Sequence, residues 1–79
     1  MRFTVILTPD LEDGGFVAEC PCVPGCISEG ASIDEALHNI KGAIEGCLES
    51  LAVHQQPLPS DGQVIVATVD ADVPALVTP

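Results

Sequence analysis

The sequence has few aromatic residues, few basic residues and no long apolar run. Its 79 residues include two phenylalanines but no tryptophan or tyrosine, and Lys and Arg number 2 against 12 Asp and Glu. The formal net charge of −10 excludes nucleic-acid binding by counterion release and disfavours anionic membranes. We therefore expect a tightly bound partner of this chain to be basic.

No apolar run approaches the roughly 20 residues that a membrane-spanning helix needs. The stretch Val5-Ile6-Leu7 after Arg2 is also shorter than the apolar region of about 7 residues that a signal peptide requires. These absences predict a cytoplasmic protein. In that compartment the 4 cysteines are expected to remain thiols rather than form a disulfide framework.

The fold is predicted from the apolar pattern, and a chain of this length holds at most one domain. Alternating apolar and polar residues, or β-branched runs, indicate strands bounded by Gly and Pro. The predicted strands are Phe3–Thr8, Phe16–Cys20, Cys26–Ser28 and Val64–Val69. The turn-forming segment Pro9–Gly15, with its Asp13-Gly14 pair, predicts a hairpin between the first two strands.

The single helix has the clearest signal in the sequence. Ser32 and Glu35 form a capping box, in which the Ser hydroxyl accepts from a free amide of the first turn and the Glu carboxylate reaches back to the backbone amide of the cap residue, Ser32. The helix is predicted from about Ile33 to about Val53. Its apolar stripe consists of Ile33, Ala36, Leu37, Ile40, Ile44, Cys47, Leu48 and Leu51,. Gly42 and Gly46 lie on the polar face of this helix. Two interpretations remain open: the glycines are tolerated sequence variation, or they form a groove where a partner approaches closely.

These elements predict an α+β domain of order β-β-β-α-β over residues 1–69, followed by a loose tail over 70–79. One mostly antiparallel sheet would be covered on one face by the single helix. The last predicted strand is apolar on both of its faces, and the uncovered face of the sheet also carries apolar residues. These residues would stay exposed in a monomer, which predicts a homodimer or higher homo-oligomer. The candidate self-association residues are Ile6, Val17, Val64 and Val66.

The cysteines could hold a metal or could simply be buried. Cys20 and Cys22 are separated by one residue, whereas zinc ligands are usually paired at two to four. Cys20 points inward in the predicted strand and Cys47 lies on the apolar helix stripe, so both fit small buried hydrophobes. We predict buried thiols rather than a metal site, with Cys22 as the most exposed and reactive of the four.

Catalysis has little support in the sequence. His38 falls on the polar helix face and His54 at the helix end, away from the predicted positions of the cysteines, so no nucleophile is placed beside a base. The acidic hairpin lacks the ligand spacing of a calcium loop. Phosphate-cradling, nucleophile-elbow and dinucleotide motifs are absent. The sequence predicts no enzyme and no cofactor.

Several motifs together resemble the HicB-like antitoxins of bacterial and archaeal toxin–antitoxin pairs. The motifs are DGGFVAECP (13–21), VPGCISEG (23–30), SIDEALxNIKxAIE (32–45) and QPLP (56–59). The resemblance covers about residues 2 to 69. It implies a degenerate, partial ribonuclease-H-like fold without catalytic carboxylates. The strand Phe3–Thr8 indeed contains no acid.

The resemblance also implies a partner and a mechanism. Family members cap a small basic HicA-like toxin, similar to double-stranded-RNA-binding domains, that cleaves mRNA with a His. The candidate toxin-binding residues are Asp10, Glu12, Asp13, Glu19 and Glu29. Only ten residues follow the last predicted strand, too few for the DNA-binding domain of longer members, so we expect no direct operator binding. Two alternatives are an orphan self-associating structural or regulatory module and a small hydrolase that uses Cys22 or the histidines.

Overall fold

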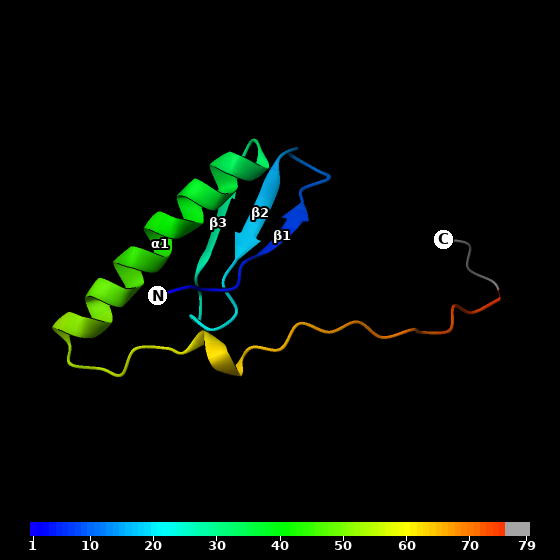
Figure 1. The fold of residues 1–79 in the computed structure, drawn as a ribbon. Coiled ribbons are helices and arrows are strands. Elements are labelled where there is room, and N and C mark those ends of the chain that lie inside the picture. The colour runs from blue at the N-terminus through cyan, green and yellow to red at the C-terminus, as the bar shows by residue number, and fades with distance from the viewer. Residues whose placement is uncertain (76–79) are drawn as a thin grey trace.

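One open sheet and one long helix make up the ordered body of the molecule (Figure 1). A computed structural model describes residues 1–75. Its strands and helices are β1 (Ile6–Pro9), β2 (Phe16–Glu19), β3 (Ile27–Gly30), α1 (Ile33–Val53) and the short 3₁₀ turn η1 (Asp61–Gln63). The strands pair antiparallel in the order β1-β2-β3. The predicted α+β class, with three strands followed by a single helix, is confirmed.

The alternation predicted for the strands decides which residues face the helix. Leu7 of β1, Ala18 of β2 and Ser28 of β3 form one cross-strand row, and Ala18 in this row is fully buried. The neighbouring row of Ile6, Glu19 and Ile27 is exposed. The sheet therefore has one face covered by α1 and one open face, because consecutive side chains of a strand point to opposite sides.

The helix begins and ends where the sequence predicts. The Ser32 side chain accepts a hydrogen bond from the Glu35 amide at 3.1 Å, and Glu35 Oε1 accepts from the Ala31 amide at 3.2 Å. The capping box is thus formed, with its carboxylate reaching one residue further back than predicted. At the other end Gln55 adopts φ 56° and donates to Ala52, while Gln56 donates to Leu51. This pair of bonds is the Schellman arrangement that terminates many helices.

The core is small and lies between α1 and the covered face. Its buried members are Ala18, Cys20, Val23, Cys26, Ala36, Ile40 and Ile44. The helix packs over β3 and β2. Ile33 and Leu37, which the apolar stripe placed toward the core, are instead exposed. The stripe is wider than the two strands beneath it, so its margins remain in solvent.

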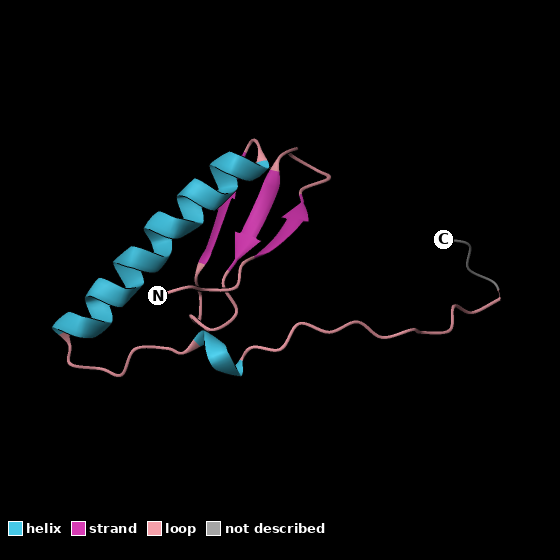
Figure 2. Ribbon diagram, in the orientation of Figure 1, coloured by secondary structure: helices cyan, strands magenta, loops and turns pink. Residues whose placement is uncertain are grey.

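The strand predicted over Val64–Val69 is not formed in the single chain, which corrects the last element of the predicted order. After η1 the described chain runs as an extended segment away from the body (Figure 2). The radius of gyration is 15.9 Å, whereas a compact chain of this length would have about 12 Å. A β-branched run favours extended backbone, but a strand also needs a neighbouring strand to receive its hydrogen bonds. Residues 76–79 of the predicted tail lie outside the described residues.

Within residues 1–75, no helix combines the length and the hydrophobicity required to cross a membrane.

Candidate functional site

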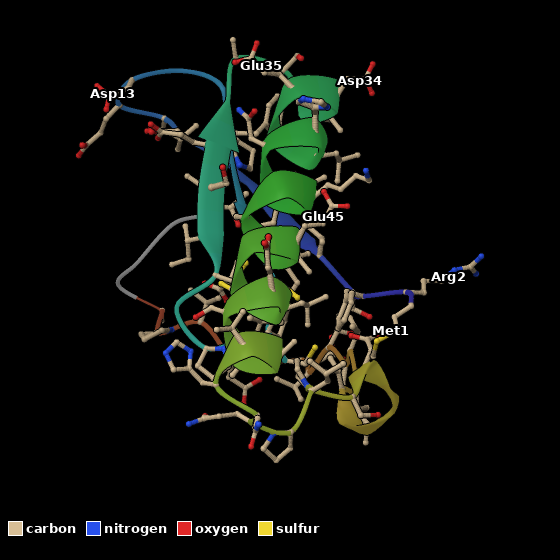
Figure 3. The ribbon with its side chains drawn as sticks, turned by 90° about the vertical axis from the view of Figure 1, so that its left-hand side faces the viewer. Met1, Arg2, Asp13, Asp34, Glu35 and Glu45 are labelled. Atoms are coloured by element: carbon tan, nitrogen blue, oxygen red, sulfur yellow. The ribbon has the colours of Figure 1, made fainter. Side chains whose placement is uncertain are left out.

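An acidic depression lies at the end of the molecule where α1 begins. It has a volume of about 440 Å³. It is lined by Asp10, Asp13, Gly14, Glu29, Gly30, Ala31, Glu35 and Asn39. Figure 3 shows Asp13, Asp34 and Glu35 at this end of the molecule, with Met1 and Arg2 well away from it. The lining holds four carboxylates and no Lys or Arg, so the depression is a strongly negative surface.

The acidic hairpin between β1 and β2 forms the outer wall. Asp10 Oδ1 accepts hydrogen bonds from the amides of Glu12 at 3.0 Å and Asp13 at 3.1 Å. Such side-chain bonds to amides two and three residues ahead are typical of Asp at the start of a turn. Gly14 and Gly15 follow with φ 77° and 79°, a conformation that side chains with a Cβ rarely adopt. Asp10 therefore folds the loop, and this fixes where the Asp13 carboxylate projects.

Two glycines bring the hairpin, the end of β3 and the start of α1 together. A Cβ at Gly15 would collide with the carbonyl oxygen of Gly30, and a Cβ at Gly30 would collide with the backbone nitrogen of Ala36. The three segments can approach this closely only because both side chains are absent. This close approach makes Glu35, from the helix, part of one lining with Asp10 and Asp13 of the hairpin and Glu29 of β3.

The depression concentrates negative charge that the chain does not neutralise. The one ion pair among the described residues, Lys41 with Glu45 at 3.5 Å, lies elsewhere on α1. The partial positive charge at the helix N-terminus compensates some of the charge of Asp34 and Glu35. A partner with several cationic side chains could pair each of them with a carboxylate here, because guanidinium and ammonium groups form their strongest hydrogen bonds with carboxylates.

The predicted toxin-binding residues separate into three locations. Asp10, Asp13 and Glu29 line the depression. Glu12 lies exposed on the hairpin, and Glu19 lies at the far end of β2, on the open face. The structure thus brings together three of the five residues and leaves two apart.

The depression also contains two polar residues, Glu35 and Asn39, that are not among the candidate site residues of the sequence. The sequence pattern assigns Glu35 to the capping box and Asn39 only to the helix. Asn39 Nδ2 donates to the carbonyl oxygen of Glu29 at 2.7 Å, which fixes α1 against the edge of β3. The short connection between β3 and α1 is a sequence signal for this placement. Because few residues join the two elements, the first helical turn must lie beside the end of the strand.

A second concave surface, the apolar groove, runs between residues 1–5 and α1. Its volume is about 530 Å³. Its apolar walls come from Phe3 and Val5 on one side and from Leu37, Ile44 and Leu48 on the other. It is also lined by Arg2, Lys41 and Glu45, so the chain's 2 basic residues both border this groove.

The cysteines lie in and around the core. Cys20 and Cys26 are buried, Cys22 and Cys47 are half-buried, and all four are free thiols. Burial, followed by the neighbouring Cys20 and Asp61, raises the pKa of Cys22 to about 11. Burial, then Cys47 and Cys20, also raises the pKa of Cys26. Cys22 is half-buried, as is Cys47, while the other two are buried, and at its raised pKa little of the reactive thiolate exists at neutral pH.

The histidines show no catalytic arrangement. His38 is exposed on α1, and the Nδ1 of His54 lies 2.8 Å from the carbonyl oxygen of Ser50 at the helix end. Within residues 1–75, no three His, Cys, Asp or Glu side chains are grouped so that they could hold a metal ion. The acidic depression and the apolar groove are the candidate sites for recognition of a partner.

Comparison with known proteins gives one family. The model of a family described as "HicB_like antitoxin of bacterial toxin-antitoxin system" matches residues 3–75. No solved structure matches the chain.

Curated relatives come from archaea and bacteria. The UPF0150 protein Ta0767 of Thermoplasma acidophilum is 48% identical over 61 residues, which are 77% of this chain and 87% of the relative. The UPF0150 protein ssr1765 of Synechocystis sp. is 43% identical over 64 residues, which are 81% of this chain and 80% of the relative. A UPF0150 protein of Helicobacter pylori is 36% identical over 59 residues, or 75% of this chain and 82% of the relative.

Proposed function

The chain belongs to the HicB-like antitoxin family of bacterial toxin–antitoxin systems. From this premise we propose that it is a non-catalytic antitoxin that binds and neutralises a small basic HicA-like toxin. The observation that carries the proposal is the acidic depression, in which Asp10, Asp13, Glu29 and Glu35 surround one concave surface. Opposite charge on the two partners speeds their encounter and selects the correct one.

The non-catalytic part of the proposal rests on the state of the nucleophiles. The pKa of Cys22 is raised to about 11, which keeps this thiol protonated at neutral pH. His38 is exposed on α1, whereas Cys20 and Cys26 are buried. Neutralisation then follows from binding alone: the antitoxin covers the toxin's basic surface, which the toxin needs for RNA.

The open face of the sheet extends the proposed interface beyond the depression. Val17 and Glu29 pair across β2 and β3, and Ile6 and Glu19 pair across β1 and β2. Acidic and aliphatic side chains therefore alternate on one surface. This surface suits a basic protein that presents both charge and apolar area. It combines two of the candidate toxin-binding residues, Glu19 and Glu29, with two of those proposed for self-association, Ile6 and Val17.

The proposal is tested by charge reversal in the depression. The cognate toxin is identified as a small basic protein encoded in the adjacent reading frame and recovered with the tagged chain from its native host. The double variant Asp13→Lys/Glu29→Lys should weaken toxin binding at least 100-fold by calorimetry, since each close charge pair is worth about 1.5 kcal/mol or more. Binding of the unchanged chain should weaken as salt is added.

The matched control is Glu49→Lys/Ser50→Lys/Gln56→Lys, which makes the same change in net charge with exposed residues outside both the depression and the apolar groove. This control should lose less than 10-fold. Equal losses for the two variants would show that only the net charge matters and would overturn the assignment of the depression. Failure to recover any small basic protein, with no encoded neighbour, would favour the alternative of an orphan self-associating module, which the exposed apolar tail supports.

A further inference from the structure

The extended segment after η1 exposes apolar side chains to water. Ile65, Val66 and Val69 are 87%, 70% and 89% exposed. The segment from 64 to 69 carries no charge, although the chain as a whole has a net charge of −10. Exposed, uncharged β-branched runs of this length pair readily with the edge of a sheet. This segment, which we call the tail strand (64–69), therefore has the properties of a strand without a neighbour.

The outer strands β1 and β3 each have one edge without a neighbouring strand among the described residues. At the edge of β3 the Asn39 side chain of α1 already binds the carbonyl oxygen of Glu29, which leaves β1 as the freer edge. Among the described residues, β1 pairs only with β2. Beside it lies the apolar groove, whose walls include Phe3 and Val5 from the segment that leads into β1. A strand added at this edge would bind β1 through its backbone and place alternate side chains in the groove.

Charge distinguishes the chain's own tail strand from that of a second copy. Asp61 is bonded to Thr4, so a tail strand that folded back on its own β1 would start at residue 4 and run parallel to it. Its acidic end, Asp70 and Asp72, would then arrive beside the acidic hairpin that contains Asp10. Like charges in that position repel, which disfavours folding back within one chain.

A tail strand from another molecule can run in the opposite direction. Asp70 and Asp72 then lie at the other end of β1, beside Arg2, which projects from the body in Figure 3. This arrangement joins an apolar segment to an apolar groove and two carboxylates to one of the chain's 2 basic residues. The complementary features lie on the same chain, so two copies can exchange tail strands reciprocally about a twofold axis.

We propose that the protein forms a homodimer in which the tail strand (64–69) of each copy adds antiparallel to β1 of the other and fills its apolar groove. The proposal does not depend on a toxin. It uses a surface separate from the acidic depression, so the dimer leaves the depression accessible.

The first experiment measures mass by light scattering of the purified full chain over a range of concentrations. The chain alone should have twice its mass of 8.1 kDa. Val66→Asp should raise the dissociation constant of the dimer at least 100-fold, because it places a charge in the apolar groove. Leu11→Asp, at an exposed hairpin position, makes a comparable change outside the groove and should leave the dimer unchanged. Circular dichroism should show the same helix content for all three proteins.

The second experiment separates exchange between copies from folding back. Arg2→Glu alone and Asp70→Arg/Asp72→Arg alone should each be mainly monomeric at concentrations where the unchanged chain is dimeric. An equal mixture of the two should form a heterodimer, since each groove–tail contact in it joins opposite charges. A mass of 8.1 kDa at every concentration, or a dimer that tolerates Val66→Asp, overturns the proposal. So does a mixture in which no heterodimer forms.

Discussion

Asp61 binds Thr4 through both carboxylate oxygens, although 57 residues separate them in the sequence. Oδ1 accepts from the Thr4 backbone amide and Oδ2 from the Thr4 hydroxyl, each at 2.8 Å. These bonds hold the start of the extended segment beside the segment that leads into β1. They also lower the pKa of Asp61, because both favour the ionised carboxylate,.

Removing this carboxylate should loosen the N-terminal segment. In Asp61→Ala, hydrogen exchange at the Thr4 amide should become faster, whereas Glu49→Ala, which removes an exposed carboxylate from α1, should leave it unchanged. NMR-detected exchange measures both. Equal protection of the Thr4 amide in Asp61→Ala and in the unchanged chain would show that another group holds this segment.

The same bonds predict a pH dependence with a definite sign. The unfolded carboxyl has a pKa of about 3.9, and in the folded chain the pKa of Asp61 is lower. The stabilisation is therefore fully present above the unfolded pKa and is lost as the pH falls through the lower, folded value. Protection of the Thr4 amide, corrected for intrinsic exchange, should follow this decline, and in Asp61→Asn it should show no such titration.

Two glycines should respond in opposite directions to substitution by alanine. At Gly30 a Cβ would collide with the backbone of Ala36, while at Gly42 nothing lies within 4 Å of its position. Gly30→Ala should destabilise the fold by about 1–3 kcal/mol through overpacking. Gly42→Ala should stabilise it by about 1 kcal/mol, because alanine is the better helix former.

Chemical denaturation of both variants measures the two effects. Gly46, which also has open space around its Cβ position, should behave like Gly42. The two sequence-based interpretations of these helix glycines can then be separated. If Gly42→Ala and Gly46→Ala stabilise the fold and leave toxin binding unchanged, they are tolerated variation, whereas weaker toxin binding would indicate a close approach by the partner.

The end of α1 offers a stabilising substitution. Gln55 adopts φ 56°, a left-handed conformation that costs a residue with a Cβ about 1 kcal/mol. Gln55→Gly should raise the free energy of unfolding by about 0.5–1 kcal/mol, since glycine adopts this conformation freely. Gln56→Gly is the matched control, because Gln56 has no positive φ. A larger gain for Gln56→Gly than for Gln55→Gly in thermal unfolding would contradict the assignment.

Cys22 should react slowly with alkylating agents. With its pKa at about 11, the thiolate fraction at pH 7 is about 10⁻⁴ and rises about tenfold per pH unit. The rate of iodoacetamide modification at Cys22, followed by mass spectrometry, should rise accordingly from pH 7 to 9. Asp61→Ala should increase the rate at a given pH, because the charge of Asp61 contributes to the raised pKa. A rate that levels off below pH 9 would refute the raised pKa.

The elements that depend on local interactions could be predicted from the sequence. Ser32 and Glu35 mark the start of α1, and both predicted helix bounds, Ile33 and Val53, are confirmed. The hairpin between β1 and β2 is confirmed as well, because Asp10 and Gly14 build the turn from residues adjacent in the chain. Capping and turn bonds join residues only a few positions apart, so the sequence pattern contains both partners.

The site and the last predicted strand depend on contacts between distant residues. The close approach at Gly15 and Gly30 brings Glu35 and Asp13 into the lining of one depression. These two residues are too far apart in the sequence for their spacing to predict this. The run from Val64 to Val69 has the composition of a strand, yet the single chain gives it no neighbour. A sequence by itself determines which segments favour helix, turn or extended backbone. Only the tertiary structure decides which of them meet, because hydrogen bonds between strands and the grouping of charges require groups from far apart in the chain.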